Sequence, residues 1–317
     1  MSLFISVGLL LVGLLVLVKG ADVFVEASSG ISKNFNVSNL VIGLTVMAFG
    51  TSAPEAFIGV RSALNGTVEL AMGNVIGSDI FNLIFIIGLA AIIAPIAIDF
   101  KSIAKDYGVA ILGPVLLLIM MLIFNNSIPR WGSFIFLVIF FLYVAFTIKK
   151  LLSKRGQHLE VEANYHIIPR PLKQNIFFAV LGLAGIIIGG ELVVHYASNL
   201  ATTFGMSPRL IGITIVALGT SLPELIIVIS ASKRKENQLA VGNIIGSSIF
   251  NILFVLGLTG IISPLPISTA LIFDLTFLIG ASGLFLIFIL TKKRLSRVEG
   301  GILVLLYFAY FFKIIVV

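Results

Sequence analysis

Two stretches of the sequence decide its fold, VIGLTVMAFGTSAPE at residues 41–55 and LIGITIVALGTSLPE at residues 210–224. A second pair follows, GNVIGSDIFN at 73–82 and GNIIGSSIFN at 242–251. In both pairs the second copy lies 169 residues after the first, without a gap. A constant offset over two separate motifs indicates that the chain is an internal duplication.

The composition places most of the protein surface in lipid. Of the 317 residues, 59% are hydrophobic and 11% are charged, and the mean hydropathy is +1.16. An apolar helix of about 20 residues crosses the hydrocarbon core, because each residue adds about 1.5 Å. The sequence contains no Cys, which excludes disulfides, thiolate metal ligands and a cysteine nucleophile.

The apolar stretches predict ten spans. They are expected at 2–31, 39–60, 68–94, 106–124, 130–149, 174–201, 208–231, 238–262, 270–291 and 298–316. Five spans per half is an odd number, so the second half enters the membrane from the opposite side. We therefore predict an all-α polytopic membrane protein of ten transmembrane helices in two inverted five-helix repeats with broken core helices. Residues 1–150 form the first repeat, 151–173 a linker and 174–317 the second repeat.

The positive charges predict the orientation. Lys and Arg in short loops stay on the cytoplasmic side, and 16 of the 21 lie on the same side as the linker. The opposite side has only Arg61, Arg130, Arg209 and Lys313. We expect a multi-pass protein of the cell membrane with both termini outside and the linker 151–173 in the cytoplasm. The net charge of +7 then reflects loops beside anionic lipid, and it indicates no nucleic-acid partner.

Two acidic residues fall in the middle of apolar spans, Glu55 and Glu224. An ionised, unpaired carboxylate at the bilayer centre costs about 3 kcal/mol. No Lys or Arg lies near either motif to pair with it, so a bound cation or a proton has to compensate the charge. A protonated carboxyl that is hydrogen-bonded in a static bundle is the alternative interpretation.

The prolines of the motifs predict how a cation would be coordinated. Pro54 and Pro223 have no amide hydrogen, so the carbonyls four residues earlier lose their helical partners. Carbonyls in 48–51 and 217–220 can then turn toward a site. Hydroxyls and carboxylates bring the total to six to eight oxygens, which suits Ca²⁺ or Na⁺ rather than a transition metal. The candidate side chains are Glu55, Glu224, Thr51, Thr220, Ser52 and Ser221.

The second pair of motifs adds a polar stripe in each half, with side chains at i, i+4 and i+8. The stripes consist of Asn74, Ser78 and Asn82 and of Asn243, Ser247 and Asn251. Hydrogen bonding between helices is the alternative role of these side chains. Asp79 has no acidic counterpart, since Ser248 takes its place, and we expect it to have a packing or modulatory role. Interfacial positions, with gating as the alternative, are expected for Asp22, Glu26, Glu191 and His195.

The motifs GTSxPE and GNxxGSxxxN in each half resemble those of the calcium/cation antiporter superfamily, and within it the prokaryotic sodium/calcium exchangers. The resemblance spans nearly the whole chain. It implies an antiporter, not an enzyme, in which inward Na⁺ flow drives Ca²⁺ out, commonly three Na⁺ for one Ca²⁺. Access would alternate as the helices 2–31 and 174–201 slide past a core. The resemblance implies no cofactor, and we expect a monomer in the lipid bilayer with Ca²⁺ and Na⁺ as substrates.

The resemblance also implies a set of ligands. The central Ca²⁺ ligands would be Glu55, Glu224 and the backbone carbonyls of Thr51 and Thr220. The flanking Na⁺ sites would use Ser78, Ser247 and the carbonyls of Ala48 and Ala217, with Asn82 and Asn251 at the border of the central site. Two carboxylates balance one Ca²⁺ but leave three Na⁺ with a net positive charge, so the exchange would be electrogenic.

The coupling ion has alternatives. Potassium-dependent members of the superfamily have an acid at the position of Asn251, so this residue argues against potassium dependence. An H⁺/Ca²⁺ or other cation antiporter is the alternative function, and Asp79 would be an extra acid beside the site. A channel would not need duplicated sites in inverted halves. A hydrolase would need a nucleophile, and His195 has none matched to it.

Overall fold

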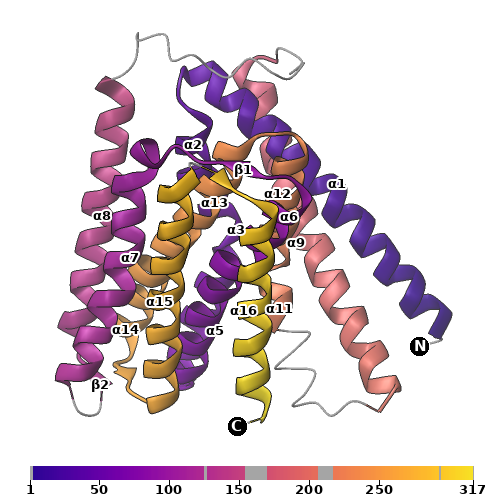
Figure 1. Cartoon of the computed structure of the whole chain (residues 1–317). Helices are drawn as coiled ribbons and strands as arrows, with labels where there is room; N and C mark the ends of the chain where they lie inside the picture. Colours follow the sequence, from indigo (N-terminus) through magenta and orange to yellow (C-terminus); the bar gives the residue numbers. More distant parts are fainter. Residues whose placement is uncertain (1–2, 125–126, 154–169, 206–216, 293, 317) are drawn as a thin grey trace.

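The computed structural model describes residues 3–124, 127–153, 170–205, 217–292 and 294–316 (Figure 1). This part of the chain is helical apart from four two-residue strands. Seven helices are long and apolar enough to cross a membrane, and counting the pair Asn39–Thr51 and Ala53–Leu64, bent by 45°, gives eight. A multi-span helical membrane protein is therefore confirmed. The count of ten spans and the inversion remain predictions.

The elements of the two halves recur along the chain. The first half contains α1 (Leu3–Phe35), α2 (Asn39–Ile42), η1 (Gly43–Met47), α3 (Ala48–Thr51), α4 (Ala53–Leu64), α5 (Val68–Ile80), η2 (Phe81–Ile86), α6 (Ile87–Ile93), β1 (Ile96–Ala97), α7 (Phe100–Ile123), β2 (Ser127–Ile128) and α8 (Arg130–Ser153). The remainder contains α9 (Leu172–Thr203), α11 (Ala217–Thr220), α12 (Leu222–Lys233), α13 (Asn237–Ile249), η4 (Phe250–Val255), α14 (Leu256–Ile262), β3 (Leu265–Pro266), α15 (Thr269–Lys292), β4 (Arg294–Leu295) and α16 (Arg297–Val316). From α3 to α7 every bound reappears 169 residues later, in α11 to α15.

The two ends of the molecule differ in what they carry. Both termini lie at one end, which we call the terminal end, and α8 finishes and α9 starts at the opposite end, the linker end (Figure 1). The strand pairs cross between the halves, because β1 pairs with β4 and β2 pairs with β3, both antiparallel. These pairs connect the halves where the chain leaves the helices.

The most buried helices carry the second motif of each half. In the most apolar 18-residue window of each span, 72% of the residues are buried for Val68–Ile93 and 83% for Asn237–Ile262, whereas only 28% are buried for Phe4–Phe35. α5 and α13 therefore form the centre of the bundle, and their asparagine and serine side chains face protein rather than lipid.

α1 and α9 cross at contacts lined by glycine. A Cβ built on Gly20 would lie 2.8 Å from the carbonyl oxygen of Gly182, and one built on Gly13 would lie 3.2 Å from that of Gly189. Gly13 and Gly182 are repeat counterparts, and so are Gly20 and Gly189. The two contacts therefore exchange under the repeat, and the α1–α9 interface is two-fold symmetric.

Several predicted bounds shift. α1 continues to Phe35 instead of ending at residue 31. α7 starts at Phe100 because Asp99 caps it, its side chain accepting from the Lys101 amide at 3.2 Å. α8 extends to Ser153 and α9 starts at Leu172, so helix enters both ends of the predicted linker. Residues 154–169 of the linker and 206–216 of the predicted span 208–231 lie outside the described residues.

Candidate ion-binding site

Each half contains a helix break at its GTSxPE motif. Ser52 lies between α3 and α4 with φ −89° and ψ 9°, and Ser221 lies between α11 and α12 with φ −94° and ψ 5°. The break follows from the proline two residues later, which cannot donate to residue i−4 but fits the first turn of a new helix. The predicted broken helices are therefore present at both motifs.

The two glutamates lie in the first turns of α4 and α12, with Glu55 1% exposed and Glu224 0% exposed. The Ser78 hydroxyl donates to Glu55 Oε1 at 3.4 Å. The Ser52 hydroxyl donates to Glu224 Oε1 at 3.3 Å. This second contact crosses from one half to the other, and the partial positive charge at both helix N-termini favours negative charge there.

Two threonines connect the broken helices to the central helix of the opposite half. Thr51 Oγ1 donates to Asn243 Oδ1 at 3.4 Å, and Thr220 Oγ1 donates to Asn74 Oδ1 at 3.5 Å. The two contacts are repeat counterparts. They show that Asn74 and Asn243 position the motif threonines, which agrees with the packing alternative for these asparagines.

Serine hydroxyls complete the connections between the halves. Ser221 Oγ donates to Ser78 Oγ at 3.3 Å, and Thr51 Oγ1 lies 3.5 Å from Ser247 Oγ. The structure thus gives hydrogen bonds to the predicted site side chains Glu55, Glu224, Thr51, Ser52, Ser221, Ser78 and Ser247. Thr220 contacts Asn74 of the opposite half.

Many polar atoms at this place have no hydrogen-bond partner among the described residues. They are Oε2 of Glu55 and of Glu224, both amide atoms of Asn82, Oδ1 of Asn251, and Nδ2 of Asn74 and of Asn243. A buried polar atom without a partner costs about 1–3 kcal/mol. Such a concentration indicates a ligand, and its free oxygens are those that a hard cation prefers.

The two remaining predicted asparagines lie in π-helical segments, Asn82 in η2 and Asn251 in η4. Such segments are rare and are frequent at functional sites. These π-helical segments were not predicted from the sequence, because α-helical spacing was assumed for the polar stripes. The repeated Phe-Asn pair at 81–82 and 250–251 was the only available signal.

Asp79 contacts a predicted site residue. Asn251 Nδ2 donates to Asp79 Oδ1 at 3.0 Å, and Asp79 is 0% exposed. Its second oxygen has no partner among the described residues. The contact agrees with the packing or modulatory role expected of Asp79, because it fixes the orientation of an amide at the site.

No basic side chain compensates the two glutamates in the part of the chain that the structure describes. The ion pairs found there both involve Glu26, with Arg170 at 3.0 Å and Arg234 at 3.5 Å. No group of three or more His, Cys, Asp or Glu gathers among these residues either. An ion at this site would therefore need hydroxyl, amide and carbonyl oxygens in addition to the carboxylates.

The backbone at Ala48 differs from the expectation of a freed carbonyl. Its oxygen accepts from the Ser52 amide at 3.0 Å and therefore keeps its helical bond. The partner that is missing is that of Gly50, because residue i+4 is Pro54. The same oxygen also accepts from Thr51 Oγ1 at 3.3 Å, so an ion that binds Ala48 would have to replace this hydroxyl contact. Ala217 begins α11, directly after residues that lie outside the described part.

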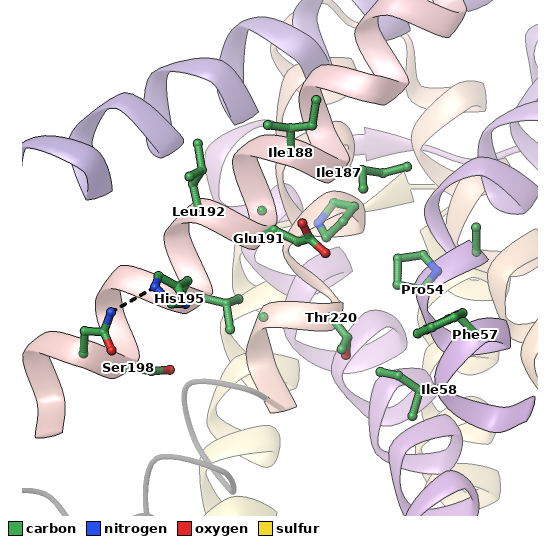
Figure 2. Close-up of a pocket in the computed structure, with 16 residues that line it drawn as sticks. Pro54, Phe57, Ile58, Ile187, Ile188, Glu191, Leu192, His195, Ser198 and Thr220 are labelled. Atoms are coloured by element: carbon green, nitrogen blue, oxygen red, sulfur yellow. Dashed lines mark hydrogen bonds between the residues drawn. The ribbon is translucent and has the colours of Figure 1, made fainter. Parts of the chain in front are cut away.

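A cavity of about 930 Å³ lies beside the two motifs. Figure 2 shows α9 on one side, with Glu191 and His195, and Pro54 of α4 and Thr220 of α11 on the other. Most of its lining is apolar, and the His195 ring lies 3.1 Å from Asn199 Nδ2 on the same helix. The cavity contacts both motifs and the half of α9 that leads to the terminal end.

Comparison with known proteins identifies the family. The family model for the sodium/calcium exchanger protein matches residues 5–149 and 175–316. CaxA of Alkalimonas amylolytica is 38% identical over 311 residues, which cover 95% of each chain. The sodium/calcium exchanger MaX1 of Methanosarcina acetivorans is 32% identical over 338 residues, covering 95% of this chain and 96% of MaX1.

Solved structures agree. The sodium-calcium exchanger NCX_Mj soaked with zero Na⁺ and Ca²⁺ superposes with a TM-score of 0.84 at 31% identity, over 99% of this chain and 100% of NCX_Mj. The same exchanger soaked with Na⁺ and Sr²⁺ gives 0.83 at 32% identity, over 98% of each chain. With its duplicated motifs and buried carboxylates, the chain belongs to the sodium/calcium exchanger family and is a membrane cation antiporter, not an enzyme.

Proposed function

We propose that this protein exchanges Na⁺ for Ca²⁺ across the cell membrane by alternating access, with inward Na⁺ flow driving Ca²⁺ out. The observation that carries the proposal is the pair of buried glutamates at two helix breaks, each with an unpartnered oxygen. Among the described residues no cationic side chain pairs with them. A divalent cation would neutralise both at once.

The central ion would be held mainly by Glu55, Glu224 and the backbone carbonyls of Thr51 and Thr220. Ca²⁺ takes about six to eight oxygens in flexible geometry, and hydroxyls of the network can supply the rest. Flanking Na⁺ would use Ser78, Ser247 and the carbonyls of Ala48 and Ala217, with Asn82 and Asn251 at the border and Ser52 and Ser221 supporting the carboxylates.

The charge of the site makes the exchange electrogenic. Two carboxylates balance one Ca²⁺, whereas three Na⁺ in the same site leave one positive charge. A membrane potential therefore acts on the Na⁺-loaded protein more than on the Ca²⁺-loaded protein. Each elementary charge moved across the membrane is worth about 2.3 kcal/mol per 100 mV.

A cavity of about 930 Å³ lies along the half of α9 that leads to the terminal end, and we infer that ions reach the site from this end in the described conformation. The distribution of Lys and Arg supports a topology with this end outside the cell and the linker 151–173 in the cytoplasm. We propose that a single chain suffices, because one copy already contains both half-sites.

The second candidate function is H⁺/Ca²⁺ or other cation antiport. Asp79, which is 0% exposed and hydrogen-bonded to Asn251, is the observation that favours it, because a buried acid bonded to a predicted site residue offers a further place for a proton.

Uptake into proteoliposomes distinguishes these candidates. Vesicles loaded with Na⁺ are diluted into Na⁺-free buffer that contains radioactive Ca²⁺, and matched vesicles carry a pH gradient alone. We expect uptake with the Na⁺ gradient, accelerated by a potential that favours exit of positive charge. Uptake that follows the pH gradient and ignores Na⁺ would refute sodium coupling. Vesicles with Glu55→Gln protein provide the background.

A further inference from the structure

The linker end of α1 is fastened to the core by polar contacts. Ser230 Oγ of α12 donates to Asp22 Oδ1 at 2.5 Å. One turn further, Glu26 pairs with Arg234 at 3.5 Å and with Arg170 at 3.0 Å. The contacts with Ser230 and Arg234 lie where α1 packs on α12, and Arg170 adds a contact from the segment before α9. Together they close this side of the bundle at the linker end.

A third contact continues the same row. Ser29 Oγ donates to Glu236 Oε1 at 3.1 Å, and Asn39 Nδ2 donates to the other oxygen of Glu236. Glu236 precedes α13, so the end of α1 is connected to the central helix as well as to α12. Three positions of α1, each three or four residues apart, thus form one closing row.

The repeat places an equivalent row on α9. The residues 169 positions after Asp22, Glu26 and Ser29 are Glu191, His195 and Ser198. All three line the cavity of about 930 Å³ at the terminal end (Figure 2). The row on α1 therefore forms contacts that close the linker end, whereas the equivalent row on α9 faces a cavity at the terminal end.

The core side of the row has counterparts too. Ser230 corresponds to Arg61, and Arg234 corresponds to Asn65. Arg61 and Asn65 lie at the end of α4 and are exposed. In the described part of the chain Arg61 forms no ion pair. The contact at the linker end joins Asp22 to Ser230. The equivalent contact at the terminal end would join Glu191 to Arg61.

The α1–α9 interface explains how the two ends could be coupled. Its glycine contacts are two-fold symmetric, so exchanging the roles of α1 and α9 leaves the interface unchanged. The close backbone approach favours movement of α1 and α9 together as one unit. A displacement that separates α1 from α12 would then bring α9 onto α4.

We propose that Glu191 pairs with Arg61 when the protein opens toward the linker end, and that this ion pair closes the cavity. The inference rests on the alternating access of the proposed function. The pair joins two opposite charges beside a mainly apolar cavity, where water is excluded on closure and the attraction between the charges increases. Release of Asp22 from Ser230 and formation of the Glu191–Arg61 pair would be two sides of one movement.

Cross-linking tests this directly, because the natural chain has no Cys. One variant carries Glu191→Cys with Arg61→Cys, and the matched variant carries Asp22→Cys with Ser230→Cys. Both are cross-linked with a short dithiol reagent in Na⁺, in Ca²⁺ and without either ion. We expect opposite trends, with conditions that raise one cross-link lowering the other by about fivefold, the lower end of usual coupling between states. Parallel trends, or no 61–191 cross-link in any condition, would overturn the inference.

Charge exchange keeps the test independent of folding. Glu191→Arg and Arg61→Glu should each lower the maximal exchange rate, whereas the double variant should recover most of it with little change in half-saturating Ca²⁺. A double variant that is slower than either single variant would contradict the pair. Reciprocal cross-links in a protein whose transport ignores Na⁺ would support the Glu191–Arg61 pair and refute sodium coupling. Exchange driven by Na⁺ without reciprocal cross-links would support sodium coupling and refute the Glu191–Arg61 pair.

Discussion

The two half-sites share their chemistry but differ in how they are held. Each has a buried glutamate after a helix break and a threonine bonded to an asparagine of the other half. Glu55 accepts from a serine of its own half, Ser78, whereas Glu224 accepts from Ser52 of the opposite half. Among the described residues, the first half alone contributes a further acid that is hydrogen-bonded to a predicted site residue, Asp79. We therefore expect the shared glutamates and threonines to form the ion site, and the serine partners and Asp79 to adjust its affinity.

The strongest test of this equivalence removes one charge at a time. Glu55→Gln and Glu224→Gln should each lower Na⁺-driven Ca²⁺ uptake by about a hundredfold or more. Each variant removes one carboxylate from the proposed contact with the bound cation, and breaking a buried charge pair costs about 3–5 kcal/mol. Glu69→Gln, at an exposed acid in the first turn of α5, is the control and should transport normally. Normal uptake by either of the first two variants would show that the half-sites are not equal.

The hydroxyl partners provide a smaller effect that separates the halves. Ser52→Ala and Ser78→Ala should each raise half-saturating Ca²⁺ by about tenfold, the value of one hydrogen bond to a charged group. Because the Ser52 hydroxyl donates to Glu224, Ser52→Ala should add little to Glu224→Asp, which keeps the charge but withdraws the carboxylate by one methylene, and should act in full beside Ser78→Ala. Binding of Ca²⁺ to the purified variants measures this, and fully additive effects of Ser52→Ala and Glu224→Asp would contradict the crossed pairing.

Substitutions of Asp79 test the difference between the two halves, since Ser248 takes its place in the second half. Asp79→Leu removes the acceptor for Asn251 and should weaken Ca²⁺ binding by about threefold to tenfold, the cost of one hydrogen bond. Asp79→Asn keeps an acceptor oxygen in the same shape and should stay within about twofold of the natural protein. Calcium titration measures both. If Asp79→Asn is as harmful as Asp79→Leu, the charge of Asp79 matters and not its hydrogen bond.

The smallest effect concerns the closed linker end. Burial raises the pKa of Glu236 above its usual 4.5, against the lowering effect of Ser29 and Asn39. The folded protein then binds this proton more tightly than the unfolded chain, so stability falls as pH rises from 4.5 through the raised pKa. The Tm of the natural protein relative to Glu236→Gln should therefore decrease over this range. A constant difference would show that Glu236 is not held as described.

The helix breaks and the paired glutamates could be predicted from the sequence, because they depend on the identity of a few neighbouring residues. The breaks follow from Pro54 and Pro223, and the duplication fixes the equivalence of the glutamates. The crossed contact of Ser52 with Glu224 could not be predicted, since it depends on how the halves pack. The π-helical segments at Asn82 and Asn251 were missed for a similar reason, as helix spacing alone does not reveal an extra residue per turn.

The contact of Asp79 with Asn251 was also out of reach. The two residues are far apart in the sequence, and the helix geometry placed Asp79 beside Ser78 without indicating what it faces. The symmetric glycine contacts between α1 and α9 were visible only as small residues, which favour close approach but do not name the partner helix.

Calcium binding to the purified protein tests the central claim most directly, without depending on transport. Titration of the detergent-solubilised protein with Ca²⁺ should show one site that Na⁺ displaces competitively and that choline at equal ionic strength does not. The site should be lost in both Glu55→Gln and Glu224→Gln and retained in Glu69→Gln. Binding that survives either of the first two substitutions, or that Na⁺ leaves unchanged, would contradict a shared Ca²⁺ and Na⁺ site built from the two equivalent halves.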